Sequence, residues 1–269
     1  MYAFDLHQPD TLQAALAHMV AGARPLAGGQ TLLASMKLRL SDSDALVDLG
    51  RLPGLDGIDI DIDSDGASVR IGAMARHADV AAHAGLRVAY PALAHLAGRI
   101  GDRQVRAMGT LGGVIANNDP AACYPSALLA SGATVITTQR EIEADDFFLG
   151  LFTTALEPEE LVLAVRFPIP LCAAYEKQRQ PASQFPLAGV FVARHAGSVR
   201  VAITGAGAGV LRHSALEAVL SRDFDPEATA IVRFDPADAA DDLHASAEYR
   251  AHLIDVLSRR AVAAAMCGG

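Results

Sequence analysis

Cysteine is scarce in this sequence. Only Cys123, Cys172 and Cys267 occur among 269 residues, and no two of them form a Cys-x-x-Cys motif. Structural zinc sites and iron–sulfur clusters are usually built from closely spaced cysteines, so the chain encodes neither locally, and no metal-ligating residue is predicted. An odd, sparse count also argues against a disulfide framework and favours a reducing compartment.

Positive charge and long apolar runs are also limited. The 22 Lys and Arg residues face 31 Asp and Glu residues, which gives a formal net charge of −9. This balance argues against nucleic acid and anionic membranes as partners, because both attract basic surfaces. The N-terminal residues 1–9 show no signal peptide, and no apolar run approaches the ~18 residues of a membrane span. We therefore expect a cytoplasmic protein, with twin-arginine export within a larger complex left open.

The two common phosphate-binding signatures are missing as well. Neither Gly-x-Gly-x-x-Gly nor Gly-Lys-Ser/Thr occurs in the sequence, which disfavours a Rossmann dinucleotide fold and a P-loop. The Gly-x-Gly-x-Gly run at Gly205–Gly209 lies late in the chain with no βαβ unit after it. We interpret this run as a turn that ends a strand.

What the sequence does contain is two separate glycine-rich segments. The first is Ala-Gly-Gly-Gln-Thr-Leu at 27–32, and the second is Gly-Thr-Leu-Gly-Gly-Val at 109–114. Glycine allows close approach of a ligand to the backbone and positive φ, and successive free N–H groups form an anion-binding nest. A single pair of this kind is most simply a tight turn. Two pairs, each beside a threonine, favour a ligand with two linked phosphates.

The residue pattern before position 54 predicts a small parallel sheet. Asp10 and Thr11 precede an amphipathic helix over 12–19, and a short buried strand over 24–27 leads into the first glycine pair. A helix beginning at Leu32 and a strand over 45–49 follow. Strand, helix and strand in this order indicate a βαβ unit within residues 1–53.

Alternating Ile and Asp residues begin the next region. Strands over 58–62 and 69–72, separated by the turn sequence Ser64–Gly66, predict a hairpin. Its regularly spaced Asp residues suggest either a calcium site or a solvated strand face, and the intervening isoleucines favour the solvated face.

The remaining pattern divides the chain after residue 170, where Pro168-Ile169-Pro170 marks a boundary. It predicts regions 54–170 and 171–269. The expected helices are 77–84, 90–100, 125–131 and 247–266, the expected strands are 133–138, 188–195 and 199–205, and 235–242 is expected to be a loop.

Taken with their order in the chain, these segments resemble the FAD-binding medium subunit of molybdenum hydroxylases, the family of carbon monoxide dehydrogenase and xanthine dehydrogenase flavoproteins. The similarity covers nearly the whole length and follows 25–32 with 36–39, 47–49, 71–74, 104–113, 152–158, 175–177 and 247–250. It implies an α+β protein: two α/β lobes that clasp FAD (the PCMH-type flavin fold, 1–53 and 54–170) and a small C-terminal α+β domain (171–269).

The resemblance also implies the cofactor-binding residues. The two glycine segments would hold the diphosphate, Val162 would lie near the adenine, and Lys177 and Phe185 would lie near the isoalloxazine ring. The full implied set is Leu26, Ala27, Gly28, Gly29, Gln30, Thr31, Leu32, Ile100, Thr110, Leu111, Gly112, Gly113, Val114, Asp119, Cys123, Val162, Lys177 and Phe185.

Two positions depart from the family pattern. Relatives often carry a carboxylate where Cys123 stands, and it binds ribose hydroxyls there; a thiol accepts such hydrogen bonds poorly, and Asp119 is the carboxylate that would partly replace it. Relatives also often carry Asn where Val114 stands, so one side-chain polar contact is missing.

The function implied by the resemblance is an electron relay. Substrate would be oxidised at a molybdopterin cofactor in a large partner subunit, and electrons would pass through 2Fe–2S clusters in a small partner subunit to FAD in this chain and on to an external acceptor. A dimer of heterotrimers is implied. No catalytic residue is predicted, because electron transfer needs no acid–base pair. The alternatives are a stand-alone flavin oxidoreductase and a flavin-free scaffold subunit.

Overall fold

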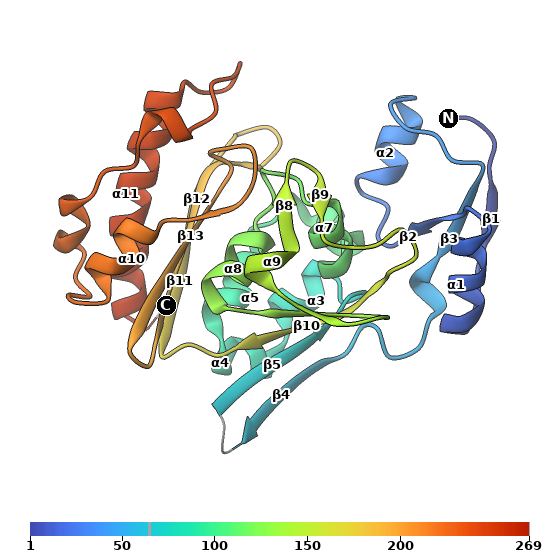
Figure 1. Ribbon diagram of the computed structural model, residues 1–269, viewed down its shortest axis with the longest axis horizontal. Coiled ribbons are helices and arrows are strands. Elements are labelled where there is room, and N and C mark those ends of the chain that lie inside the picture. The colour runs from blue at the N-terminus through green and yellow to red at the C-terminus, as the bar shows by residue number, and fades with distance from the viewer. Residues whose placement is uncertain (64–65, 269) are drawn as a thin grey trace.

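Three bodies lie in a row in the computed structural model, which describes residues 1–63 and 66–268 (Figure 1). The N-terminal lobe, the central lobe and the C-terminal domain contain a three-, a five- and a four-stranded sheet respectively. Helices accompany each sheet, so the α+β fold class is confirmed.

The N-terminal lobe is the predicted parallel sheet. Thr11 caps the first helix by accepting a hydrogen bond from the Ala14 N–H at 3.3 Å. The strand order is β1-β3-β2, with both pairs parallel. Its elements are β1 (Asp5–His7), α1 (Leu12–Val20), β2 (Arg24–Leu26), α2 (Leu32–Lys37), β3 (Ala45–Asp48) and a 3₁₀ turn at Leu49–Arg51.

Strand β2 is not buried, and that part of the prediction is wrong. Arg24 and Pro25 are exposed and Leu26 is half-buried. The reason is its position: β2 is an edge strand, and its free edge faces a cleft instead of the core. The core of this lobe also includes Leu55 and Leu161, which come from beyond residue 53.

The central lobe is built on an antiparallel sheet in the order β4-β5-β10-β6-β7. Its strands are β4 (Ile58–Asp63), β5 (Gly66–Gly72), β6 (Thr134–Thr137), β7 (Glu141–Glu143) and β10 (Val162–Pro168), and a small ribbon adds β8 (Phe148–Gly150) and β9 (Thr153–Thr154). Its helices are α3 (His77–Ala82), α4 (Ala84–Ala89), α5 (Pro91–Gly98), α6 (Arg103–Met108), α7 (Leu111–Asn117), α8 (Tyr124–Ser131) and α9 (Ala144–Phe147).

The predicted hairpin is confirmed by the antiparallel pairing of β4 with β5. Its turn was predicted at Ser64–Gly66, of which residues 64 and 65 lie outside the described residues. Four helices of this lobe, α4, α6, α7 and α9, were missed by the sequence pattern. Two of them begin at side-chain caps outside the glycine segments. One is α4, which begins where the His83 ring accepts the Leu86 N–H at 3.1 Å. The other is α6, which is capped by Asp102 through the Val105 N–H at 2.8 Å.

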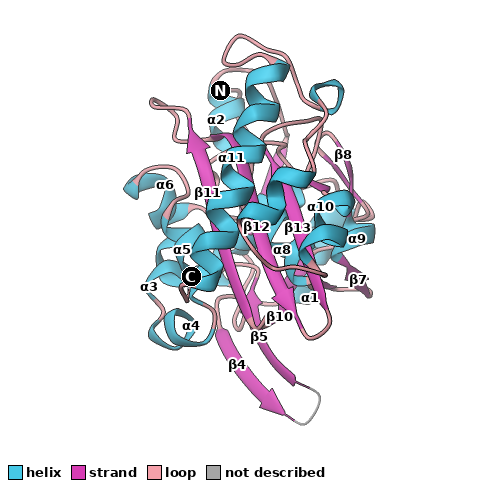
Figure 2. Cartoon of the chain, turned by 90° about the vertical axis from the view of Figure 1, so that its left-hand side faces the viewer, coloured by secondary structure: helices cyan, strands magenta, loops and turns pink. Residues whose placement is uncertain are grey.

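One sheet serves two cores in the C-terminal domain. Figure 2 shows α11 (Ala247–Met266) lying across β11 (Cys172–Arg179), β12 (Pro186–His195) and β13 (Ser198–Thr204). The opposite face contacts α5 and α8 of the central lobe. Because side chains alternate along a strand, Val190 and Val192 join the domain's own core, whereas Phe191 and Ala193 join that of the central lobe.

The remaining elements of this domain are β14 (Leu211–Arg212), α10 (Ser214–Leu220) and 3₁₀ turns at Glu227–Ile231 and Pro236–Asp238. The run beginning at Gly205 follows β13 directly, as predicted for a strand-ending turn. Buried Arg250 fixes this turn, because its guanidinium donates to the carbonyls of Leu187 and Gly205 and pairs with Asp242.

The central lobe contains a buried carboxylate, that of Glu160. It accepts hydrogen bonds from the Thr137 hydroxyl at 2.6 Å, the Arg140 guanidinium at 3.2 Å and the Glu157 N–H at 2.9 Å. Burial by itself would raise the pKa of Glu160. These three donors outweigh it and hold the pKa below the ordinary value of 4.5.

We therefore expect Glu160→Gln to lower the free energy of unfolding by about 1–3 kcal/mol near neutral pH. Because the folded-state pKa is depressed, this contribution is present above the ordinary value and is lost as pH falls through the folded value. Urea unfolding from about pH 7 to about pH 4 checks this, and the difference between wild type and variant should shrink. The exposed neighbour Glu159, changed to Gln, is the control. A pH-independent difference would contradict the assignment.

Candidate functional site

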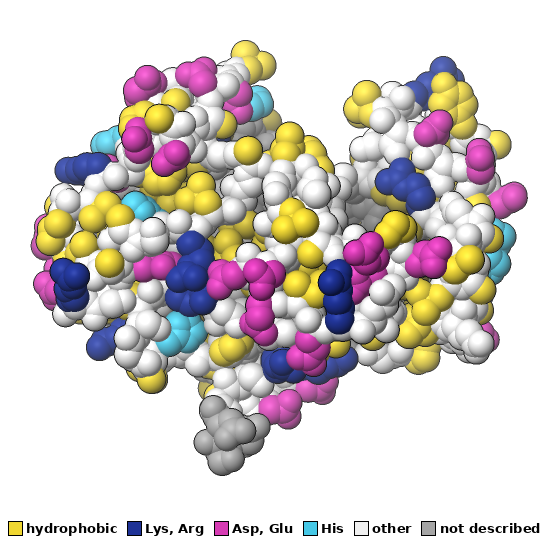
Figure 3. Space-filling view, viewed as in Figure 1, with side chains coloured by type: hydrophobic (Ala, Val, Ile, Leu, Met, Phe, Trp, Pro, Cys, Tyr) yellow, Lys and Arg dark blue, Asp and Glu magenta, His cyan; other side chains and the backbone are white. Residues whose placement is uncertain are grey.

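A cleft of about 580 Å³ lies where the three bodies meet. Figure 3 shows the surface hollowed between the N-terminal lobe and the rest of the molecule. The walls come from segments far apart in sequence: 24–32 of the N-terminal lobe, 109–123 of the central lobe and 183–186 of the C-terminal domain. The cleft therefore exists only in the folded chain.

The first glycine segment presents free backbone donors. Gly29 has φ of +69°, a conformation that glycine adopts without strain. The N–H groups of Gly29, Gln30 and Thr31 have no protein acceptor in the described part of the chain, and the Thr31 side chain does not cap α2. Three successive unpaired donors on a cleft wall are available to an anion, and their contact with one stays a prediction.

Gly28 brings the two glycine segments into contact. A Cβ at this position would lie 2.1 Å from the Met108 carbonyl oxygen and 2.8 Å from the Gly109 Cα. No side chain fits between these backbones. Glycine at position 28 is therefore required for the N-terminal lobe to close against the central lobe.

The second segment is not a free nest, and this correction concerns Leu111 and Gly112. Their N–H groups donate to the carbonyls of Ala75 at 3.1 Å and Ala73 at 2.8 Å, and Gly113 donates to the Thr110 hydroxyl at 3.2 Å. These bonds tie the start of α7 to the chain that follows β5. Leu111 is fully buried and does not line the cleft, whereas Gly112 lets α7 approach Ala73.

The loop after α7 supplies the polar corner of the cleft. Asn118 has φ of +45° and donates to the carbonyls of Gly150 and Thr153, each at 2.8 Å, which fixes the loop. One oxygen of Asp119 accepts the Ala121 N–H at 2.8 Å. Its other oxygen has no protein donor among the described residues, and buried Cys123 lines the same cleft.

The C-terminal domain contributes a buried cation. The Lys177 amine donates to the Gln184 carbonyl at 2.9 Å and lies 3.5 Å from the Cys123 sulfur. Burial is the main cause that lowers the pKa of Lys177, with Arg99 and Arg179 adding to it and Cys123 opposing it. Phe185, by contrast, is half exposed at the rim of the cleft, where a planar ligand can stack on it.

Of the eighteen residues predicted from the sequence, all except Leu111 line this one cleft. The structure brings Ile100 and Val162 to the same cavity as the glycine segments and Lys177. Contact of each residue with a ligand stays a prediction.

Several lining residues were missed by the sequence. Met74, Leu156 and Gln184 lie outside the glycine motifs. Met74 and Leu156 fall within the family segments 71–74 and 152–158 but were not assigned to the site, and Gln184 carries no local signal. His77 is fully buried, and burial together with Arg106 lowers its pKa to about 4, so the ring is neutral near neutral pH. Its Nδ1 is buried and has no hydrogen-bond partner among the described residues.

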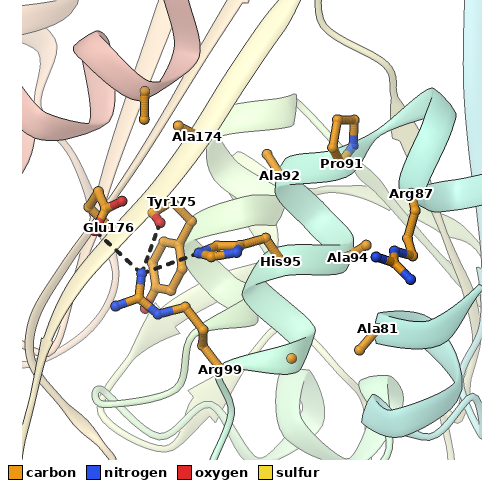
Figure 4. A pocket seen from close by; sticks show the side chains of 12 residues that line it. Ala81, Arg87, Pro91, Ala92, Ala94, His95, Arg99, Ala174, Tyr175 and Glu176 are labelled. Carbon is orange, nitrogen blue, oxygen red and sulfur yellow. Dashed lines mark hydrogen bonds and ion pairs between the residues drawn. The ribbon is translucent and has the colours of Figure 1, made fainter. Parts of the chain in front are cut away.

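A second cavity, of about 570 Å³, lies on the outer side of β11 against α5. Figure 4 shows Arg99 on one side of this cavity, with interactions to His95, Glu176 and the Tyr175 carbonyl. The same guanidinium donates to the Lys177 carbonyl at 3.2 Å, so it fixes the strand that carries Lys177 into the cleft.

Neither metal nor membrane chemistry is visible in what the structure describes. Within residues 1–63 and 66–268, no three His, Cys, Asp or Glu side chains are grouped to hold a metal ion. No helix in these ranges has the length and hydropathy that a bilayer crossing requires.

Comparison with protein families shows which family this chain belongs to. Residues 2–170 match the family described as the FAD-binding domain of molybdopterin dehydrogenases. This chain belongs to that family. The match covers both lobes that form the glycine-lined walls, and FAD is the cofactor of this chain.

Individual members of the FAD-binding family are similar over nearly the full length. The carbon monoxide dehydrogenase medium chain of Hydrogenophaga pseudoflava is 32% identical over 97% of this chain and 96% of its own length. The nicotine 6-hydroxylase medium subunit of Paenarthrobacter nicotinovorans is 33% identical, with coverage of 88% and 87%. A chain of reconstituted carbon monoxide dehydrogenase from Oligotropha carboxidovorans superposes with a TM-score of 0.88 at 32% identity, covering 100% of this chain and 99% of its own.

The cleft fits the cofactor of the FAD-binding family. Its volume of about 580 Å³ lies within the usual range of about 300–1,000 Å³ for cofactor sites. The free N–H groups of Gly29–Thr31 suit a diphosphate, and the apolar walls at Ile100, Val114 and Val162 suit flat rings. The residues present therefore match the chemistry of FAD.

We expect Gly29→Asp to weaken FAD retention at least about tenfold, which is about 1.4 kcal/mol. The carboxylate would occupy the free N–H concavity and repel a diphosphate. Gly22→Asp is the matched control, because Gly22 also has positive φ, lies away from the cleft and has open space where its Cβ would be. Both variants carry a similar backbone strain of about 1–2 kcal/mol, and at position 29 the flexible Leu33 side chain, 2.8 Å from the added Cβ, must also shift. Flavin absorbance after gel filtration measures retention, and equal retention in the two variants would contradict the diphosphate assignment.

Proposed function

We propose that this chain is the FAD-containing electron-transfer subunit of a molybdenum hydroxylase. Its partners in this proposal are a small iron–sulfur subunit and a large molybdopterin subunit, assembled as a dimer of heterotrimers. The observation that carries the proposal is the FAD-type cleft in a chain whose described residues group no metal ligands of their own. Medium chains and subunits of multisubunit dehydrogenases among the relatives support it.

The roles of the residues follow from their places in the cleft. When bound, FAD supplies redox chemistry by accepting and passing on electrons. Gly29, Gln30 and Thr31 hold the diphosphate with uncharged backbone donors. Val162 covers the adenine side, and Asp119 takes the ribose hydroxyls where Cys123 does not.

The C-terminal domain contributes the residues at the isoalloxazine end of the cleft. Phe185 covers a ring face, and Lys177 places a buried positive charge on the wall. A cation in a water-poor site favours the more negatively charged state of whatever is bound beside it. Lys177 therefore raises the reduction potential of the cofactor.

The substrate of the complex is not set by this chain. Relatives of almost equal identity belong to proteins named for carbon monoxide and for nicotine. The residues that line the cleft serve the cofactor in this proposal, so recognition of the substrate falls to a partner subunit.

The first test of this proposal is partner dependence. The purified chain should be yellow, with a flavin spectrum, and should reduce no acceptor with organic substrates by itself. Turnover should appear on addition of its iron–sulfur and molybdopterin partner subunits. Turnover by the chain alone would instead support a stand-alone oxidoreductase, and a folded chain that binds no flavin when FAD is supplied would support a scaffold.

The second test concerns Lys177. We expect Lys177→Met to lower the FAD reduction potential by about 30 mV or more, the equivalent of a tenfold change for a two-electron couple. Lys177→Arg should largely restore it. Arg179→Met is the control, because Arg179 is an exposed cation on the same strand that does not line the cleft. Spectroelectrochemical titration measures the potentials. Equal shifts for Met at 177 and at 179 would refute a local role for Lys177.

A further inference from the structure

A thiol and an amine face each other across a domain boundary in this chain. Cys123 stands at the start of α8 in the central lobe, and Lys177 lies on β11 of the C-terminal domain. The Lys177 Nζ and the Cys123 Sγ are 3.5 Å apart. Both residues are at least 95% buried, yet both line the cleft, so small molecules reach them from that side only.

The amine is held in place toward the sulfur. The Lys177 Nζ donates to the Gln184 carbonyl at 2.9 Å, and the Lys177 carbonyl accepts the Arg99 guanidinium at 3.2 Å. Arg99 is itself fixed by Glu176 and the Tyr175 carbonyl (Figure 4). The amine therefore approaches the sulfur from a strand anchored on its far side.

The surroundings favour reaction between the two groups. The Tyr175 hydroxyl is buried, and its pKa is raised by burial and then by its interaction with Cys123. No carboxylate pairs with the Lys177 amine in the described structure. Burial is the main cause that lowers the pKa of Lys177, with Arg99 and Arg179 adding to it and Cys123 opposing it, and the neutral amine is the form that reacts.

We propose that Cys123 and Lys177 form a modification site, at which dioxygen joins the thiol and the amine into a covalent N–O–S bridge. The S–H bond, one N–H bond and the O–O bond break, and an S–O and an O–N bond form. Sulfur and nitrogen each lose two electrons, and dioxygen gains four. The second oxygen atom leaves as water with the two released hydrogens. Dithiol reductants reverse the reaction, with four electrons and four protons returning the thiol, the amine and one water.

The bridge has two consequences for the cleft. It links α8 covalently to β11, and so it fixes the central lobe to the C-terminal domain. It also removes the titratable amine of Lys177, which, resting on the proposed function, lowers the reduction potential of the cofactor. Exposure to dioxygen would then change the reduction potential of the cofactor through this one bond.

The test uses the full chain with FAD, purified under nitrogen and divided into anaerobic and air-exposed samples. Trypsin does not cut at a bridged Lys177, so the bridge joins the peptides 107–140 and 167–179 with a mass gain of about 14 Da over their sum. We expect this species in the air-exposed sample, its loss after dithiothreitol, and fragmentation that assigns the link to Cys123 and Lys177.

Controls separate the bridge from other oxidation. Cys172→Ser should leave it unchanged, although Cys172 lies on the second peptide, and Cys123→Ser should abolish it. Free Cys123 after prolonged aeration, or Cys123 found only as sulfinic or sulfonic acid with normal cleavage at Lys177, would overturn the proposal. The visible spectrum of the same sample reports FAD separately, so failure of the bridge is distinguishable from failure of the proposed function.

Discussion

The cleft depends on one backbone contact between lobes. Gly28 rests against the Met108 carbonyl and Gly109, at a distance that excludes any Cβ. This contact sets how closely the parallel sheet of the N-terminal lobe approaches the central lobe. It places the free N–H groups of Gly29–Thr31 opposite the start of α7. Two backbone segments can form a cofactor-binding wall in this way only where a glycine leaves no side chain between them.

The two glycine segments are similar in sequence, but their backbone N–H groups have different partners. In the first, unpaired donors face the cleft. In the second, Leu111 and Gly112 give their donors to Ala75 and Ala73, and the glycines serve close packing of α7. The distinction matters because buried N–H groups must find acceptors. The chain that follows β5 lies beside the second segment and supplies carbonyl acceptors. The first segment follows the edge strand β2, where no such carbonyl accepts its N–H groups among the described residues.

The cleft contains a buried cation as well as carboxylates, because Lys177, Asp119 and Glu160 all line it. The chain carries a formal net charge of −9, yet the deep end of the cleft is lined by Lys177. That side chain is placed by a sheet with two buried faces: β12 packs on α11 through alternate residues and on the central lobe through the others. The same arrangement brings Cys123 within reach of the amine. The redox properties of the bound cofactor and the proposed bridge therefore depend on one domain interface.

The sequence by itself determined the local elements and the cofactor class. Thr11 marks a helix start, alternation marks the hairpin strands, and the ordered motifs resemble an FAD-binding family, because caps, periodicity and glycine turns are encoded in neighbouring residues. Only the tertiary structure decided which donors are free, that β2 is exposed and Leu111 buried, and that His77 lines the cleft. Each of these depends on which distant backbone lies opposite, as Ala73 does for Gly112 and Met108 does for Gly28. The contact of Cys123 with Lys177 has the same origin, since it joins residues 54 positions apart in the chain.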